Sequence, residues 1–209
     1  MIRIAVADDH AIVRRGLKQI ISETNDLRVT GEAGSAEELL TLLRAAKFDL
    51  VVLDLTLGVR SGIDLVRQIK GEFPSLPVLI LSMHAEDLFA IRALRAGAAG
   101  YIQKEEAPEE LVSAVRQIAA GRTYVSAAMA ERLAHELSHG GAASLPHERL
   151  SDRELEVFRL LGHGKSVSDI AQALNLSVKT VSTHRGRILE KTGFRNNAEI
   201  IHYVVTNSL

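Results

Sequence analysis

Five polar residues in the first half of the chain have types and spacings that could do chemistry together. Each follows a short apolar run: Asp8 and Asp9, Asp54, Ser82, and Lys104. Clustered carboxylates raise one another's cost of ionisation, and a divalent cation relieves that repulsion. Because carboxylate oxygens are hard ligands and the chain has no cysteine, the predicted ion is Mg²⁺ rather than zinc. Beside Mg²⁺, Asp54 is a predicted nucleophile toward phosphorus, with Lys104 and Ser82 contacting phosphoryl oxygens.

Each of these residues also has an ordinary structural explanation. An acid after a strand often caps the next helix, which Asp8 or Asp9 could do here. A lone lysine at a strand end is usually solvated, and a lone serine usually belongs to a turn. The functional interpretation therefore depends on all five residues occurring at strand ends in chain order.

Strand and helix patterns alternate over the first 120 residues and must position these side chains. Apolar runs typical of buried strands occur at Ile2–Ala7, Arg28–Ala33, Leu50–Asp54, Val78–Ser82 and Gly100–Gln103. Helical patterns lie between and after them at Ala11–Glu23, Ala36–Ala46, Gly62–Glu72, Leu88–Ala96 and Pro108–Ala120. The predicted fold class is α/β, a flavodoxin-like doubly wound five-stranded parallel sheet covered by helices on both faces. Such a sheet brings the polar strand ends to one edge.

After Gly121 the pattern becomes wholly helical. A short helix is predicted at Ser126–Ser138, and the segment HGGAASLP, His139–Pro146, has the composition of a flexible linker. Ser151 and Glu154 form a capping-box pattern that opens a helix through Leu161. Further helices are predicted at Ser166–Leu174, Val178–Thr192 and Asn197–Val205, with a tight turn at 175–177. We therefore expect a sheet domain at residues 1–122, a helical and flexible linker at 123–147, and a small all-α domain at 148–209.

Composition excludes several classes of protein. The chain has 209 residues, of which 46% are hydrophobic, and the absence of cysteine excludes a disulfide scaffold and a cysteine nucleophile. The N-terminus lacks the pattern of a secretory signal, and no apolar run approaches the roughly 18–20 residues that a membrane span needs. We expect a cytoplasmic protein that does not contact a membrane.

Charge is distributed unevenly along the chain. Residues 149–209 hold nine lysines and arginines against six acids, whereas residues 1–148 hold 16 against 20. This asymmetry indicates different partners for the two halves, with the basic half suited to an anionic partner.

Four segments resemble the receiver domain of two-component response regulators: VADDHAIVRRGL, LDLTLGVRSG, ILSMH and GYIQKEEAPEEL. The resemblance covers residues 1–122. It implies that Asp54 is the phosphoacceptor, which takes a phosphoryl group from the phosphohistidine of a cognate histidine kinase. The implied Mg²⁺ ligands are Asp9, Asp54 and the backbone carbonyl of Thr56, with Asp8 acting through water. Lys104 is the implied cation beside the phosphoryl group.

The same resemblance matches Ser82 and Tyr101 to the switch pair of receivers. In that pair the hydroxyl moves to the phosphoryl group and the aromatic ring follows inward, although Tyr101 could also be an ordinary aromatic at the edge of the core. Two departures stand out. Leu57 and Gly58 stand where receivers commonly have Met-Pro. Glu105 stands where many receivers have a proline after the lysine, although members of the NarL/FixJ branch, which this chain resembles, often lack that Lys-Pro bond. We expect both to change the rate and lifetime of phosphorylation rather than abolish it.

The segment LSDRELEVFRLLGHGKSVSDIAQALNLSVKTVSTHRGRILEKTG, Leu150–Gly193, is similar to the LuxR-type helix-turn-helix that ends NarL/FixJ regulators. Ser177 is the predicted N-cap of the second helix of this motif. The apolar positions predict two buried faces, one formed by Ile170, Ala171 and Leu174 and the other by Val178, Val181, Ile188 and Leu189.

The resemblance implies that the helix Val178–Thr192 enters the major groove of double-stranded promoter DNA. Seven of its residues are the predicted DNA contacts: Lys179, Thr180, Ser182, Thr183, His184, Gly186 and Arg187. By analogy, Ser182, Thr183 and Gly186 read bases and the other four contact phosphates. His184 could instead pack between helices, and a glycine inside a helix costs about 1 kcal/mol relative to alanine.

Together these patterns predict a two-component response regulator that acts as a DNA-binding transcription factor. Phosphorylation of Asp54 is expected to control homodimerisation and sequence-specific binding to promoter half-sites, with RNA polymerase a further candidate partner. Because no external metabolite is turned over, we do not expect an enzyme, although slow autodephosphorylation is expected. Two alternatives stay open: an Asp-nucleophile phosphatase, suggested by the triplet Asp54-Leu55-Thr56, and an output domain that binds only proteins.

The glycine after Leu57 yields a first prediction. Proline fixes φ and stiffens a loop, whereas glycine leaves it free, so Gly58→Pro should tighten Mg²⁺ binding at the neighbouring Thr56 carbonyl. Calorimetric titration of Mg²⁺ into the variant and the parent measures the effect. An unchanged or weaker affinity in the variant would show that this loop does not limit binding.

Overall fold

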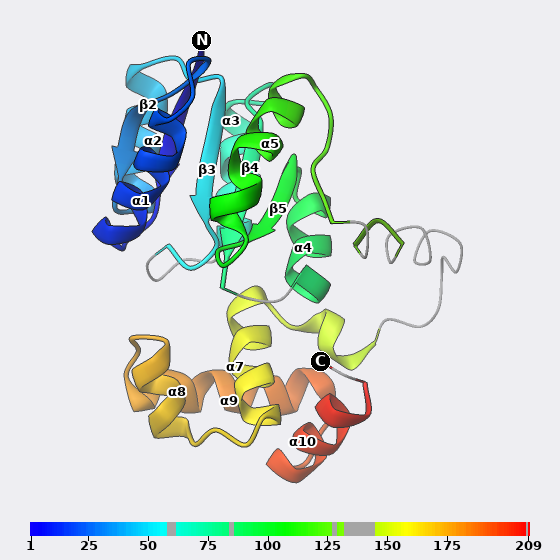
Figure 1. The fold of residues 1–209 in the computed structure, drawn as a ribbon. Helices are drawn as coiled ribbons and strands as arrows, with labels where there is room; N and C mark the ends of the chain where they lie inside the picture. Colours follow the sequence, from blue (N-terminus) through cyan, green and yellow to red (C-terminus); the bar gives the residue numbers. More distant parts are fainter. Residues whose placement is uncertain (58–61, 84–85, 127–128, 132–144, 208) are drawn as a thin grey trace. The chain divides into compact units, whose positions relative to one another are not determined.

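Five parallel strands form the sheet of the first part of the chain (Figure 1). In chain order they are β1 (Ile2–Ala7), β2 (Leu27–Ala33), β3 (Leu50–Asp54), β4 (Val78–Ser82) and β5 (Gly100–Gln103). Their order in the sheet is β2-β1-β3-β4-β5, with every pair parallel. The chain changes winding direction between β1 and β3, so their carboxyl ends flank the crevice where doubly wound sheets place their sites. The predicted sheet is confirmed.

The structure, a computed structural model, describes residues 1–57, 62–83, 86–126, 129–131, 145–207 and 209. The chain divides into two compact units, Met1–Ser138 and His139–Leu209. Gly58 lies outside the described residues, as does most of the predicted helix Ser126–Ser138, of which residues 129–131 are described as helical. None of the described helices has the length and hydropathy that crossing a bilayer requires.

Helices cover both faces of the sheet. They are α1 (Ala11–Ser22), α2 (Ala36–Ala45), α3 (Gly62–Glu72), α4 (Glu86–Arg95) and α5 (Ala107–Ala119). On one face, Leu17 of α1 and Leu111 of α5 share a buried cluster with Val6 and Val52 of the strands. The alternate strand residues, such as Val51 and Leu53, are equally buried, because β3 is covered on both sides. This double burial explains why the strands are apolar along their whole length.

The predicted element bounds in this unit agree with the structure to within two residues. The largest difference is at α4, which begins at Glu86 rather than Leu88. Strand β2 begins one residue early because Leu27 pairs with Ile2 at the start of β1.

The outer edge of β5, which no other described strand of the sheet covers, pairs with Tyr124, a residue that follows α5. The Tyr124 N–H donates to the Ala99 carbonyl at 2.9 Å, and the Tyr101 N–H donates to the Tyr124 carbonyl at 3.1 Å. The Tyr124 hydroxyl donates to Oε2 of Glu110 in α5 at 3.0 Å. The beginning of the predicted linker is therefore part of the sheet unit.

The second unit is helical. A 3₁₀ helix η1 (Pro146–Arg149) precedes α7 (Asp152–Gly162), α8 (Val167–Ala173), α9 (Val178–Thr192) and α10 (Asn197–Thr206). The predicted capping box of Ser151 and Glu154 is confirmed, and so is the Ser177 cap of α9. The N-terminus of α8 carries a second capping box, formed by Ser166 and Asp169. The predicted linker again overlaps a folded unit, because His147 of η1 is 3% exposed and its Nδ1 lies 2.8 Å from the Tyr203 hydroxyl of α10.

Packing of the helix-turn-helix follows the predicted pattern in part. Ile170 and Ala171 of α8 and Val181 and Ile188 of α9 are buried, whereas Val178 is 51% exposed. The prediction for Val178 was wrong because it is the first residue of α9, before the stripe that packs on α7 begins. Leu174 and Leu189 are only half-buried.

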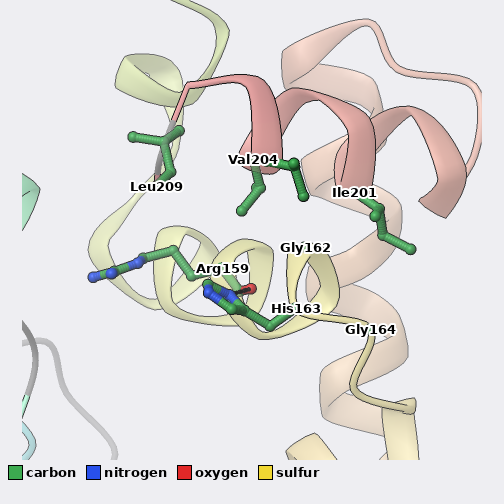
Figure 2. A pocket seen from close by; sticks show the side chains of 8 residues that line it. Arg159, Gly162, His163, Gly164, Ile201, Val204 and Leu209 are labelled. Atoms are coloured by element: carbon green, nitrogen blue, oxygen red, sulfur yellow. Dashed lines mark hydrogen bonds between the residues drawn. The ribbon is translucent and has the colours of Figure 1, made fainter.

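The C-terminal end of α7 lies close against α10. Figure 2 shows Gly162, the last residue of α7, facing Val204 of α10 beside a hollow that His163, Ile201 and Leu209 also line. A Cβ atom added at Gly162 would lie 2.4 Å from Cγ2 of Val204. The absence of a side chain at residue 162 is therefore required for this helix crossing.

Two glycine variants form a matched test of this packing. We expect Gly162→Ala to lower the free energy of unfolding of the helical unit by about 1–3 kcal/mol, because the branched Val204 side chain must shift. Gly186→Ala in α9 should raise it by about 1 kcal/mol, since a Cβ there meets nothing within 4 Å and alanine favours helix. Chemical denaturation followed by circular dichroism measures both. Equal stability of Gly162→Ala and the parent would contradict the packing argument.

Candidate functional site

Asp8 and Asp9 follow β1 but differ in burial. The Asp8 side chain is 1% exposed and the Asp9 side chain 39%. Oδ1 of Asp8 accepts the His10 N–H at 2.8 Å. The N-cap of α1 is His10, which makes no side-chain cap bond, so neither acid caps this helix in the usual way. The helix-cap explanation of these two acids is therefore not supported.

Asp54 ends the buried strand β3, and its side chain is fully buried. Oδ1 accepts the Thr56 N–H at 3.2 Å, and Oδ2 accepts the Thr56 hydroxyl at 2.9 Å. These bonds fix the carboxylate in one orientation at the carboxyl edge of the sheet. The role of the Thr56 side chain was not foreseen, because the sequence suggested only its backbone carbonyl.

Lys104, just after β5, joins the two buried acids. Its Nζ lies 2.7 Å from Oδ2 of Asp8 and 2.9 Å from Oδ2 of Asp54. Burial by itself lowers the pKa of Lys104, but the bond to Asp8 and the charge of Asp54 outweigh it and raise the pKa above its ordinary value. The ammonium is therefore charged at neutral pH and balances part of the negative charge of the cluster.

The carboxylates also lie close enough to hold a metal ion together. Ligand atoms of Asp8, Asp9, His10 and Asp54 all lie within 4.8 Å of one another. Three carboxylates suit Mg²⁺, which prefers oxygen ligands and retains water. The sequence interpretation missed His10, whose Nδ1 lies 2.6 Å from Oδ1 of Asp9; its position next to the two acids was the available signal.

Ser82 and Tyr101 are both buried, at 0% and 1% exposure. Ser82 is the last residue of β4, and its carbonyl accepts the Lys104 N–H at 2.8 Å. Tyr101 is the second residue of β5 and pairs with Ile80 of β4. Ser82 is thus joined to Lys104 at the edge that holds Asp54, while the switch role of Ser82 and Tyr101 remains a prediction.

The seven predicted DNA contacts divide between two faces of α9. Five are exposed: Lys179, Ser182, Thr183, Gly186 and Arg187. Thr180 is half-buried, and its hydroxyl lies 2.8 Å from the Ser177 hydroxyl at the cap.

His184 is also half-buried, and its position differs from that expected of a phosphate contact. Its Nδ1 is buried and has no hydrogen-bond partner among the described residues. Burial lowers the pKa of the imidazole; the Glu154 carboxylate opposes this shift, and Arg153 adds to it. The alternative that His184 packs between helices agrees better with this environment.

Comparison with known sequences identifies both units. Residues 4–116 match the family described as response regulator receiver domain. Residues 148–204 match the family described as bacterial regulatory proteins, luxR family. The response regulator GacA of Pseudomonas aeruginosa is 34% identical over 209 residues, which cover all of this chain and 98% of GacA.

The chain belongs to the response-regulator family. It is a two-component response regulator with a receiver domain and a LuxR-type output domain. The response regulator UvrY of Escherichia coli is 31% identical over all of this chain and 96% of UvrY. The predicted family is therefore confirmed.

Solved structures agree with the fold of this response regulator. RcsB from Salmonella enterica serovar Typhimurium, bound to promoter rprA in the presence of phosphomimetic BeF3⁻, gives a TM-score of 0.62 at 29% identity. The match covers 98% of this chain and 99% of the RcsB chain. A LuxR-family response regulator from Aurantimonas sp. SI85-9A1 is 39% identical over 66% of this chain, with a TM-score of 0.61.

A further contact at the receiver site was missed from the sequence. Nη1 of Arg14 in α1 donates to the Asp8 backbone carbonyl at 2.6 Å. Arg14 thereby fixes the backbone after β1, where Asp8 and Asp9 lie. Its signal was weak, since an arginine inside an amphipathic helix is usually a surface residue.

Removal of the buried cation provides a test of the charge balance. Without Mg²⁺, Lys104→Met should lower the free energy of unfolding of the receiver by about 3 kcal/mol, because two buried carboxylates lose their partner. Saturating Mg²⁺ should restore more stability to the variant than to the parent. Chemical denaturation with chelator and with Mg²⁺ measures both effects.

Lys18→Met is the matched control for this substitution. Its ammonium pairs with Glu32 at 2.6 Å, but both side chains are exposed, so we expect a change of less than about 1 kcal/mol. If Lys104→Met were as mild as the control, the buried pairing would have no energetic importance.

Proposed function

We propose that this response regulator is phosphorylated on Asp54 by a histidine kinase and that phosphorylation controls its binding to promoter DNA. The observation that carries the proposal is the buried Asp54 carboxylate, held by Lys104 beside Asp8 at the carboxyl edge of the sheet. The carboxylate is oriented by its bonds from Thr56 and lies beside a cation, as a nucleophile toward phosphorus must be.

The acids of the site suit Mg²⁺ as its cofactor. Asp9 and Asp54 would hold the ion directly with the Thr56 backbone carbonyl, and Asp8 would act through water. Bound Mg²⁺ would neutralise charge that develops on the phosphoryl oxygens. The donor set of three carboxylates within one cluster supports this choice of ion.

The chain's own residues account for the transfer. A carboxylate oxygen of Asp54 forms a bond to phosphorus while the bond from phosphorus to the kinase histidine nitrogen breaks, and the electron pair leaves with that nitrogen. Lys104 stabilises the charge on the phosphoryl oxygens, and Ser82 donates its hydroxyl to one of them. Tyr101 then follows inward as the switch residue.

The exposed face of α9 is the proposed reader of promoter half-sites. In this proposal Lys179 and Arg187 contact phosphates, and Ser182, Thr183 and Gly186 lie along base edges; the exposure of all five residues supports it. The structure of RcsB bound to promoter rprA supports a DNA-binding output domain in this chain, which shares the fold of RcsB.

Dimerisation is the proposed link between phosphorylation and DNA binding. Ile201 and Val205 of α10 are 38% and 70% exposed, which leaves an apolar stripe for a second copy. The structure of two RcsB dimers bound to two parallel DNAs supports this assembly. RNA polymerase is a further proposed partner, and the cytoplasm is the proposed location.

The protein is proposed to act without turning over an external substrate, apart from slow loss of its own phosphoryl group. A phosphatase is the enzyme alternative. Steady hydrolysis of a phosphomonoester by the purified chain would favour it over the proposal.

Labelling with a small phosphodonor tests the phosphoacceptor. With Mg²⁺ and acetyl phosphate, the parent should gain one phosphoryl group and Asp54→Asn none, because an amide oxygen is a far weaker nucleophile toward phosphorus. Intact-protein mass spectrometry measures the gain. Asp64→Asn removes an exposed acid of α3 and should be labelled like the parent. Labelling of Asp54→Asn to the same extent as the parent would refute the assignment.

The DNA arm of the experiment uses genomic fragments selected by the parent protein. Electrophoretic shifts over a salt series should show affinity falling steeply with salt, because phosphate contacts release counterions. An output domain that binds only proteins would give no salt-dependent shift.

A further inference from the structure

One face of α9 combines two apolar residues with two polar ones. Val181, His184, Ile188 and Lys191 recur at spacings of three and four and therefore share a face of the helix. Val181 and Ile188 are fully buried. Its buried part packs on α7, on the side away from exposed Lys179 and Ser182, whereas the Lys191 side chain at its C-terminal end is 40% exposed.

Glu154 of α7 meets the C-terminal end of that inner face. Its side chain is 3% exposed, and its Oε2 accepts Nζ of Lys191 at 2.6 Å and the Ser151 N–H at 2.8 Å. Burial alone would raise the pKa of Glu154, but the bonds from Lys191 and Ser151 outweigh it and hold the pKa below its ordinary value. One carboxylate oxygen therefore completes the capping box at the N-terminus of α7 and also binds Lys191 of α9.

Arg153, the preceding residue, meets the other helix of the motif. Its Nη2 donates at 2.9 Å to the carbonyl of Leu174, which is the C-cap of α8. Its Nη1 pairs with the buried carboxylate of Glu156. The first turn of α7 thus binds the end of α8 through residue 153 and the last turns of α9 through residue 154.

The Glu154–Lys191 bond can influence the position of the DNA-facing residues through the length of α9. Lys191 lies twelve residues after Lys179, more than three turns along one rigid helix. Because an α-helix moves largely as one unit, we expect a change in how residue 191 is held to tilt α9, including the exposed residues near its N-terminus. The side chains that would meet base edges depend on that tilt, whereas loose attraction to phosphates does not.

We propose that Glu154 and Lys191 form a positioning pair that sets the angle of α9 and so determines sequence-specific DNA recognition, although neither side chain contacts DNA. The inference rests on the proposed DNA-binding function and names the residues that regulate its specificity. It also assigns the Lys191 ammonium to Glu154 and half-buried His184 to the inner face of α9, apart from the phosphate contacts.

Two lysines on opposite faces of the same helix provide the test. Lys191→Met should lower affinity for a parent-selected genomic fragment by about tenfold, while affinity for a scrambled duplex of equal length and its salt slope stay unchanged. Lys179→Met, on the outer face, should weaken binding to both duplexes and reduce the salt slope by about one. Fluorescence anisotropy over a salt series measures all four affinities.

The pairing itself is tested by a double-mutant cycle. Glu154→Gln should lose specific affinity as Lys191→Met does, and the double variant should be no worse than either single one, because both remove the same bond. Lys191→Arg can still donate to Glu154 and should recover most of the specific affinity. If Glu154→Gln does not fold, the comparison of Lys191→Met with Lys191→Arg still decides the matter.

Two outcomes would overturn the inference. One is that Lys191→Met weakens both duplexes equally and lowers the salt slope, which would make Lys191 a phosphate contact. The other is that both single variants bind the selected fragment like the parent. Failure of the parent to select any DNA would instead refute the proposed function, so the two failures are distinguishable.

Discussion

Two acids buried at one edge of a sheet require a positive charge within reach, and the ion pairs of Lys104 meet that requirement. Asp8 follows β1, Asp54 ends β3 and Lys104 follows β5, so the contact closes only when the sheet has its observed order. β4 lies between β3 and β5 and must keep both in register. The apolar strands, the covering helices and the polar edge are therefore parts of one arrangement. The single charge of Lys104 balances only part of the charge that these acids can carry, which leaves room for a second cation at the same edge.

Most of the fold could be predicted because the residue pattern within each element indicates how that element is buried. Runs such as Leu50–Leu53 are apolar without alternation, which only a strand covered on both faces explains. Ser151 and Glu154, three residues apart, form the capping box that predicts the start of α7. The clustering of Asp8, Asp54 and Lys104 was predictable as well, because parallel strands end at a common edge.

What escaped prediction depends on contacts between distant segments. The Arg14 bond to the Asp8 carbonyl and the Thr56 hydroxyl bond to Asp54 are set by loop geometry that residue types do not encode. In α9, the period of the helix placed Val181 and Ile188 inside, but polarity suggested that His184 faced outward. Its half-buried position beside Glu154 and Arg153 follows from the packing of α9 on α7, which residue types alone do not encode.

The pairing of Tyr124 with β5 bears on where the receiver can be cut from the rest of the chain. A fragment that ended at Arg122 would keep α5 but lose the residue whose backbone occupies the edge of the sheet. The N–H of Tyr101 would then be open to another strand, and exposed strand edges promote association between molecules. A fragment carried past Val125 keeps that edge closed. The folded receiver thus extends beyond its last long helix, and a fragment that includes residues 123–125 should associate less than one that ends at Arg122.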